Sequence, residues 1–335
     1  MKAARLGSAK GLDGLRVVEE EGPGTPARGE ILVRLHASSL NYRDYGVAVG
    51  RLPAAPCVVL LADGAGLVEA IGAGVTEFAV GDRVMSCFFP QWLDGEPILT
   101  DFSSTPGDGA DGYAREYVVR PAHWFTHAPR HMSHLEAATL PTAGVTAWRA
   151  LVVNGSLKAG DTVLVLGTGG VSIFALQLAK MMGAIVIATS SSDAKLERIR
   201  ALGADHTVNY TRHPDWAAQV LDCTAGRGVD HVIEVGGPAT LPQSIAACRI
   251  GGHIALIGVL TGIEGNVPTV KLMSRQQRLQ GVTVGSRRHQ QEMVRGLDAT
   301  GLKPVIDKTF PLGSLVEAFR YEETRNHFGK IGITI

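Results

Sequence analysis

A short run of glycines in the middle of the chain has the composition and spacing of an anion-binding turn. The apolar residues 163–166 precede it, and an amphipathic stretch follows it. A Gly-x-Gly-x-x-small pattern between a strand and a helix lets the backbone approach a pyrophosphate closely, and it points the free N–H groups of the helix at that anion. Ser172 takes the third small position. The run therefore predicts a dinucleotide site formed by Gly167, Thr168, Gly169, Gly170 and Val171.

The end of the next predicted strand bears on which dinucleotide binds. An acidic residue at this point would hold the ribose hydroxyls of NAD, but here the strand ends in TSSS. The hydroxyls of Ser190 and Ser191 and the charge of Lys195 suit a 2′-phosphate, so the sequence favours NADP over NAD. Two other interpretations remain open. Ser192 or Asp193 caps the next helix while Lys195 is a solvated surface charge, or Asp193 acts as a displaced acid for NAD.

The elements around this turn indicate two domains and an α/β fold class. Over residues 144–285, apolar strands alternate with amphipathic helical segments, which is typical of a doubly wound parallel sheet covered on both faces. Residues 1–143 show short β-branched runs broken by Gly, Pro and Asp, which predict a β-rich domain. Residues 286–335 return to strand, helix and strand. We therefore expect one domain from 1–143 with 286–335, and a second from 144–285.

Composition limits the partners and the compartment. The chain has 32 basic and 32 acidic side chains, so no overall charge favours nucleic acid or an anionic membrane. Its four cysteines form no CxxC pair, which fits a reducing compartment better than a disulfide framework or a zinc lobe. No stretch has the apolar length of a signal peptide or membrane span. We expect a cytoplasmic protein that acts on a small, apolar molecule.

Several longer runs carry a resemblance over nearly the whole chain. They are ASSLNYRDY (37–45), GAGLVEAIGAGVTEFAVGDRV (64–84), AATLPTAGVTAWRAL (137–151), HVIEVGGPATLPQSIAACRIGGHIALIG (231–258) and HFGKIGI (327–333). With the order of a β-rich domain and then a Rossmann domain, they resemble the medium-chain dehydrogenase/reductase superfamily. The resemblance implies a GroES-like catalytic domain, a Rossmann dinucleotide-binding domain, an active site in the cleft between them, and a homodimer.

The departures from that superfamily concern zinc. By resemblance, the places of the catalytic zinc ligands in its zinc-dependent alcohol dehydrogenases are taken here by Asn41, Ala62 and Thr142, and none of these is a good zinc ligand. The cysteine-rich structural zinc lobe is also missing, because residues 86–113, which correspond to it, contain a single cysteine, Cys87. The chain therefore resembles the zinc-independent branch, which includes quinone oxidoreductases and enone reductases, and we expect no metal.

The absence of a Lewis acid favours substrates in which hydride addition produces a delocalised anion, such as quinones and enones. The cofactor supplies the hydride. The resemblance implies that Asn41 and Tyr42 are the catalytic candidates: Asn41 donates an amide N–H to the substrate oxygen, and Tyr42 is either a proton donor or a wall packed against the cofactor. Phe88 and Trp92 form either an apolar mouth for the substrate or a small core beneath a long loop.

Further residues join the predicted cofactor site. Some lie at the carboxyl ends of predicted Rossmann strands, where cofactors bind; others belong to segments that in the resembling family approach the nicotinamide or close over the NADPH phosphates. They are Thr142, Thr146, Gly236, Val259, Leu260, Phe328 and Lys330.

Taken together, the sequence predicts an NADP-preferring oxidoreductase that transfers hydride to a quinone, an enone or a related carbonyl compound. Three alternatives remain open. They are an NAD(P)-dependent alcohol dehydrogenase acting on alcohols or aldehydes, an enoyl-thioester reductase that uses Arg287 and Arg288 as a basic patch for its substrate, and a non-catalytic NADPH-binding protein.

Overall fold

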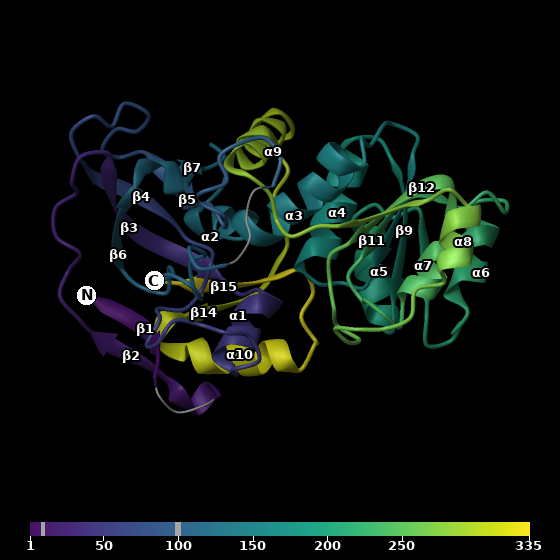
Figure 1. The fold of residues 1–335 in the computed structure, drawn as a ribbon, viewed down its shortest axis with the longest axis horizontal. Coiled ribbons are helices and arrows are strands. Elements are labelled where there is room, and N and C mark those ends of the chain that lie inside the picture. Colours follow the sequence, from purple (N-terminus) through teal and green to yellow (C-terminus); the bar gives the residue numbers. More distant parts are fainter. Residues whose placement is uncertain (8–10, 98–101) are drawn as a thin grey trace. The chain divides into compact units, whose positions relative to one another are not determined.

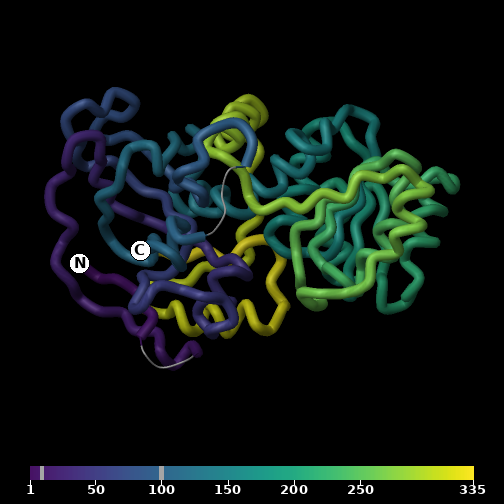
Figure 2. Tube along the Cα trace, in the orientation of Figure 1, coloured from purple at the N-terminus to yellow at the C-terminus, as the bar shows by residue number. Residues whose placement is uncertain are grey.

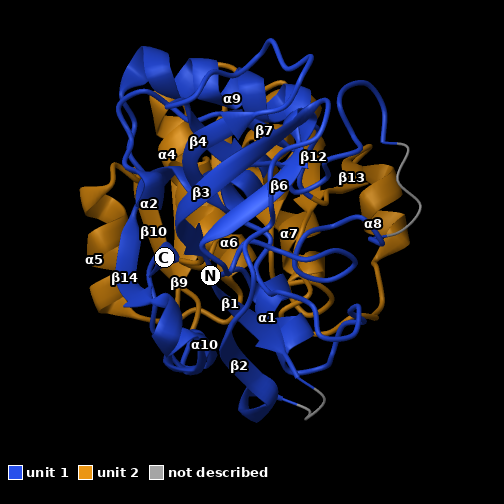
Figure 3. Cartoon of the chain, turned by 90° about the vertical axis from the view of Figure 1, so that its left-hand side faces the viewer, with its two compact units in different colours: residues 1–145, 284–335 blue, residues 146–283 orange. Residues whose placement is uncertain are grey.

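The chain divides into two compact units. The computed structural model describes residues 1–7, 11–97 and 102–335. Unit 1 comprises Met1–Val145 and Val284–Ile335, and unit 2 comprises Thr146–Thr283 (Figure 3). The division lies two residues from each boundary predicted above, at 145 rather than 143 and at 284 rather than 286. Residues 98–101, in the segment that replaces the zinc lobe, lie outside the described residues.

Unit 1 is built mainly on antiparallel strands. Strand β3 (Glu30–Ser39) is central: it pairs with β4 (Ala65–Ile71), with β6 (Tyr117–Pro121) and with β15 (Lys330–Thr334). Its side chains at Ile31, Val33 and Leu35 are buried while residues between them are more exposed, so one face of the strand covers the core. The remaining strands are β1 (Lys2–Leu6), β2 (Leu15–Glu19), β5 (Arg83–Ser86), β7 (Phe125–His127) and β14 (Ile306–Pro311).

The C-terminal segment, which is the yellow end of the trace in Figure 2, completes unit 1. Strand β14 pairs with β15 in parallel, and β15 pairs with β3 antiparallel, with Gly332 opposite Ser39. This register brings the start of β15 to the end of β3. The helices of unit 1 are α1 (Tyr42–Ala48), α2 (His134–Ala137), α9 (Arg287–Thr300) and α10 (Leu315–Glu323), with short helical turns at Leu12–Gly14, Ala122–Trp124, Leu140–Gly144 and Leu312–Ser314.

Unit 2 is a doubly wound parallel sheet, so the α/β fold class is confirmed. Its strand order is β10-β9-β8-β11-β12-β13, and every pair is parallel. The order reverses between β8 and β11, which is where such sheets bind ligands at their carboxyl edge. The strands are β8 (Thr162–Leu166), β9 (Ile185–Ser190), β10 (His206–Asn209), β11 (Val229–Glu234), β12 (Cys248–Leu256) and β13 (Arg278–Gly281).

Helices cover both faces of this sheet, with α4 and α5 on one side and α6 and α7 on the other (Figure 1). Strand β8 is buried along its whole length, which explains its continuous apolar sequence. The helices are α3 (Val145–Trp148), which starts at the unit boundary, a further turn at Arg149–Asn154, α4 (Gly170–Met181), α5 (Asp193–Ala201), α6 (Trp216–Cys223), α7 (Leu241–Ala247) and α8 (Thr269–Ser274).

The apolar run VTVGS at 282–286 follows the edge strand β13 and lies outside any strand. Within the described residues, no helix is long and apolar enough to cross a membrane.

Candidate functional site

The glycine turn of unit 2 has the backbone geometry of an anion cradle. Strand β8 ends at Leu166, Gly167 takes a left-handed φ of 73°, and Gly169 caps helix α4 with an ordinary φ of −73°. The backbone N–H of Gly167 donates to Thr189 O at 2.9 Å, which ties the turn to β9. A Cβ atom built on Gly167 or on Gly169 would meet no atom within 4 Å.

This open space is informative at Gly169. Neither its φ nor any neighbour in the chain requires glycine there, so the missing side chain leaves room for something that is not part of the protein. At the third position, Ser172 is buried and donates its Oγ hydrogen to Leu166 O at 2.7 Å, which packs the helix closely on the strand. The geometry fits the pyrophosphate of a dinucleotide at the N-terminus of α4.

The tip of β9 carries the predicted 2′-phosphate residues in different environments. Ser190 is buried, Ser191 is exposed and Lys195 is half-buried in the first turn of α5. The Oγ atom of Ser192 accepts the backbone N–H of Lys195 at 3.4 Å, so Ser192 is the helix cap. That part of the alternative interpretation is correct.

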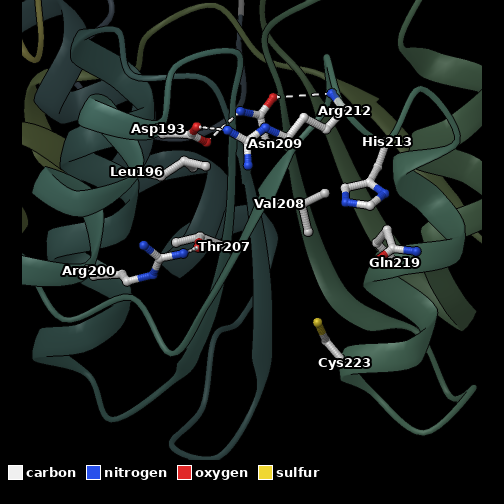
Figure 4. Close-up of a pocket in the computed structure, with 10 residues that line it drawn as sticks. All are labelled: Asp193, Leu196, Arg200, Thr207, Val208, Asn209, Arg212, His213, Gln219 and Cys223. Carbon is white, nitrogen blue, oxygen red and sulfur yellow. Dashed lines mark hydrogen bonds and ion pairs between the residues drawn. The ribbon is translucent and has the colours of Figure 1, made fainter.

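Asp193 is held by neighbours rather than presented alone. Its carboxylate accepts Asn209 Nδ2 at 2.7 Å and forms an ion pair with Arg212. Figure 4 shows these three side chains beside a hollow of about 220 Å³ between α5, β10 and α6. The hollow is lined by Asp193, Leu196, Arg200, Thr207, Val208, Asn209, Arg212, His213, Gln219 and Cys223. Both carboxylate oxygens of Asp193, which would accept the ribose hydroxyls of NAD, therefore already have partners within the protein.

The carboxyl ends of β11 and β12 supply the remaining predicted groups of unit 2. The buried carboxylate of Glu234 accepts the backbone N–H groups of Gly236 at 2.7 Å and Gly237 at 3.0 Å, so it shapes the turn after β11. Val259 and Leu260, just beyond β12, are 46% and 42% exposed. Apolar side chains exposed at this edge fit contact with a bound cofactor. Thr146, also predicted, is buried in α3 at the beginning of unit 2.

Unit 1 holds a buried polar cluster around Asp63. This residue is fully buried, and its Oδ2 atom accepts Ser39 Oγ at 2.8 Å and Asn41 Nδ2 at 2.9 Å, while Oδ1 accepts Thr142 Oγ1 at 2.6 Å. Lys330 Nζ lies 3.7 Å from Oδ2. The cluster therefore joins the predicted residues Asn41, Thr142 and Lys330, which come from distant parts of the sequence.

Asn41 is the cap of helix α1, and its amide is fully engaged. Its Nδ2 group donates to Asp44 Oδ2 at 3.1 Å as well as to Asp63, and its Oδ1 atom accepts Lys330 Nζ at 2.5 Å. Asp44 in turn accepts the backbone N–H groups of Asn41 and Ala62 at 2.9 and 3.1 Å. In this arrangement both amide hydrogens of Asn41 are donated within the protein, so the predicted donation to a substrate oxygen would require one of these bonds to break.

Burial sets the ionisation of this cluster. It raises the pKa of Asp44 to about 6, with Asp63 adding to the rise. It also raises the pKa of Glu322, at the end of α10, to about 8, with Asp44 contributing. Burial lowers the pKa of Lys330, and the surrounding carboxylates oppose that shift. The Oε2 atom of Glu322 is buried and has no hydrogen-bond partner in the described part of the chain.

Four of the predicted site residues are buried within unit 1. Lys330 is 3% exposed and bonded inside unit 1, so it is not presented to a cofactor phosphate, and Phe328 beside it is 1% exposed. Trp92 is 2% exposed, and its Nε1 donates to Gly95 O at 3.1 Å. Phe88 is equally buried and packs edge-on against Phe89 with ring centroids 4.7 Å apart. The small core beneath a loop, rather than an open mouth, describes these aromatics.

Four residues of the cluster, Ser39, Asp44, Asp63 and Glu322, are absent from the site residues predicted from the sequence. Asp63 stands between apolar residues and a Gly-Ala-Gly run, and a single acid in such surroundings is a signal of a buried, hydrogen-bonded carboxylate. Glu322 has no comparable signal, since it lies in an amphipathic helix rich in charge. Tyr42, in contrast, begins α1 and is 43% exposed, which suits either of its predicted roles.

The donor set of this cluster does not fit zinc. Asn41, Ala62 and Thr142 offer an amide, a methyl group and a hydroxyl where thiolates or imidazoles are needed, and the ammonium group of Lys330 lies among them. In the residues that the structure describes, no group of three or more His, Cys, Asp or Glu side chains is arranged to hold a metal ion.

Comparison with known proteins gives consistent matches of fold and differing names. The alcohol dehydrogenase GroES-like domain matches residues 27–130, and the zinc-binding dehydrogenase family matches residues 170–299. The chain is 45% identical over 336 residues to the zinc-type alcohol dehydrogenase-like protein C1773.06c of Schizosaccharomyces pombe, covering 97% of this chain and 96% of that protein.

Two solved structures extend the likeness. The crystal structure of an NAD-dependent alcohol dehydrogenase matches with a TM-score of 0.89 and 36% identity over 100% of both chains. That of the Pseudomonas syringae pv. Tomato DC3000 quinone oxidoreductase matches with a TM-score of 0.83 and 28% identity over 100% of this chain and 99% of that one.

Proposed function

Because the chain belongs to the medium-chain dehydrogenase/reductase superfamily of oxidoreductases, we propose that it is an NADPH-preferring reductase that acts without a metal ion on quinones, enones or related carbonyl compounds. The observation that carries this proposal is the cluster around Asp63. Asn41 and Thr142, which stand where zinc-dependent relatives have ligands, hydrogen-bond to Asp63, and a lysine ammonium group lies 3.7 Å from the same carboxylate.

Unit 2 has the groups to bind the cofactor. The cradle of Gly167 and Gly169 fits the pyrophosphate, and the exposed Val259 and Leu260 fit the far end of a dinucleotide. When bound, the cofactor supplies the hydride. The preference for NADPH is supported by Ser191 and Lys195 at the tip of β9, and by the ion pair that already neutralises Asp193. A neutralised acid repels a 2′-phosphate less than a free one does.

In unit 1, Tyr42 is an exposed residue whose hydroxyl can act on the substrate. Since the Asn41 amide is engaged, the hydroxyl of Tyr42 is the better candidate to donate a hydrogen bond or proton to the oxygen on which negative charge develops. A quinone or enone spreads that charge over a conjugated system, so a single hydroxyl donor suffices where a simple alkoxide would need a cation.

The alternatives have unequal support. Alcohol dehydrogenase activity is favoured by the names of two of the similar proteins, and it remains the second candidate. An enoyl-thioester reductase needs free cations for a phosphate-bearing substrate, but Arg287 pairs with Glu77 and Arg288 with Glu292. A non-catalytic NADPH-binding protein would share the cradle and differ only in lacking turnover.

We also infer a homodimer in the cytoplasm. Strand β13 pairs only with β12 on the described sheet path, so its other edge is open to a second copy of the chain. The four cysteines are all thiols, which suits a reducing compartment.

The test is oxidation of NADPH and NADH by EDTA-treated protein against a panel of quinones, enones, aldehydes and enoyl-CoA esters. Turnover of quinones or enones that survives chelation and prefers NADPH is the expected result. Activity that disappears on chelation and returns with zinc, or that is confined to alcohols and aldehydes with NAD(H), would overturn the proposal. Binding of NADPH with no turnover of any acceptor would favour the non-catalytic alternative.

A further inference from the structure

Lys330 is a buried cation with a defined set of partners. It opens strand β15, whose backbone is fixed to the end of β3 because Leu40 N donates to Ile331 O at 3.0 Å. Its Nζ atom donates to Leu40 O and to Asn41 Oδ1, both at 2.5 Å, and lies 3.7 Å from Asp63 Oδ2. Two of the three ammonium hydrogens are thus committed to the segment that leads into helix α1.

The charges around Lys330 require a cation at this place. Asp44 and Asp63 are 3% and 0% exposed, and Glu322 lies near enough to influence Asp44. Removing the only buried partner of an ion cluster normally destabilises it, because the opposite charge is left uncompensated. Arg43, which follows Tyr42 in α1, does not take this role, since it pairs with Asp108.

The ammonium group also determines which way the Asn41 amide faces. Its carbonyl oxygen points to Lys330 and its NH₂ group to the carboxylates of Asp44 and Asp63. The opposite orientation would place NH₂ against the ammonium group and the carbonyl oxygen against two carboxylates, which pairs donor with donor and acceptor with acceptor. Lys330 therefore fixes the cap of α1, and through Asp63 the same cluster fixes the hydroxyl of Thr142.

We propose that the ammonium group of Lys330 is the resident cation of this buried cluster and that it is a positioning residue for hydride transfer. It acts through two sets of contacts, one through Asn41 and one through Asp63. Asn41 holds the first residue of α1, Tyr42, and Asp63 holds Thr142. The proposal rests on the reductase function proposed above, and it replaces the expectation that Lys330 binds a cofactor phosphate.

The test compares wild type with Lys330→Met, which keeps the aliphatic stem and removes the charge. Lys271→Met, an exposed lysine in α8 of unit 2, is the matched control. Three quantities are measured: the NADPH dissociation constant, the rate of hydride transfer in a single turnover at saturating cofactor and acceptor, and the ¹⁵N–¹H signals of the Asn41 side-chain amide, assigned by their loss in Asn41→Asp.

We expect Lys330→Met to bind NADPH with a dissociation constant within twofold of wild type and to show shifted Asn41 amide signals. Its single-turnover rate should fall about 100-fold or more, which is the range of loss when an active-site donor is misplaced. An unchanged rate with NADPH affinity reduced tenfold or more would overturn the proposal and return Lys330 to a cofactor phosphate. Unchanged rate, affinity and amide signals would overturn it as well.

A second variant separates positioning from stability. Lys330→Met with Asp63→Asn removes both charges, so it relieves the uncompensated carboxylate and recovers much of the lost thermal stability. The proposal expects the hydride-transfer rate to stay low in this folded double variant; recovery of both stability and rate would mean that Lys330 is only structural. If wild type turns over no acceptor, the proposed function fails, and the Asn41 amide signals still decide whether Lys330 positions that side chain.

Discussion

The glycine cradle makes opposite predictions for protein stability and cofactor binding at Gly169. Alanine at this position adds one methyl group in a space where no protein atom lies within 4 Å, at a φ of −73° that alanine adopts freely. Reduced freedom of the unfolded chain stabilises the variant by about 0.4–1 kcal/mol. Alanine is a poorer helix cap than glycine by about 0.5–1 kcal/mol. The two effects nearly cancel, so we expect the free energy of unfolding to change by less than about 0.5 kcal/mol.

Cofactor affinity should fall in the same variant. The added methyl group occupies the space through which a pyrophosphate reaches the backbone N–H groups at the start of α4. Loss of one hydrogen bond to a charged group costs about 1.5–3 kcal/mol, which corresponds to a rise of about 10- to 100-fold in the dissociation constant for NADPH. Titration calorimetry gives the affinity and urea denaturation gives the stability.

Gly167→Ala is the matched control, because it tests backbone strain at the neighbouring glycine. Its φ of 73° is left-handed, so alanine there costs about 1–2 kcal/mol of stability even though the space around it is equally open. A Gly169→Ala protein that binds NADPH as tightly as wild type would refute the cradle as the pyrophosphate site. Destabilisation of Gly169→Ala by as much as Gly167→Ala would show that glycine is needed there for the fold.

Three further outcomes follow from the site. Glu322→Gln should stabilise the protein by about 5 kcal/mol at pH 9 and little at pH 4. The pKa of Glu322 is raised to about 8, so the native wild-type protein loses stability as the pH rises from the ordinary glutamate value through 8, whereas glutamine cannot ionise. Urea denaturation across this range checks the prediction, and parallel wild-type and variant curves would contradict it. Tyr42→Phe should lower kcat about 100-fold with cofactor affinity unchanged if its hydroxyl is the donor, whereas steady-state kinetics showing only a higher KM would indicate a wall. Lys195→Ala should weaken NADPH about tenfold and NADH hardly at all; equal weakening of both by calorimetry would count against a 2′-phosphate contact.

The parts of this molecule that the sequence predicts are those governed by short-range patterns. The turn from β8 into α4 follows from adjacent residues, since apolar strand, glycines and amphipathic helix are contiguous, and the alternation of strands and helices then predicts the parallel sheet. The cluster around Asp63 depends instead on residues that are far apart, because Lys330 and Asn41 are separated by 289 positions. The sequence pattern places both near an active site, but it does not specify that they bond to each other.

The same limit applies to the roles predicted for Asn41 and for the aromatic residues Phe88 and Trp92. Asn41 has a side chain suited to donate to a substrate, yet nothing in its neighbourhood in the sequence shows that Asp63, 22 positions away, accepts one of its hydrogens. Trp92 and Phe88 are apolar in a loop-rich segment, a pattern shared by binding mouths and by small cores. Only their burial in the folded unit, at 2% exposure each, distinguishes the two.

The buried ammonium group of Lys330 also constrains the chemistry. Zinc stabilises an alkoxide by leaving one coordination position open to the substrate oxygen. Lys330 offers no equivalent position, because its ammonium group donates to Leu40 O and Asn41 Oδ1 and its next neighbour is the carboxylate of Asp63. The cation can therefore organise the protein but cannot share the charge of the substrate directly. This limit supports the proposal that the substrate delocalises its own charge after accepting hydride, as a quinone or an enone does.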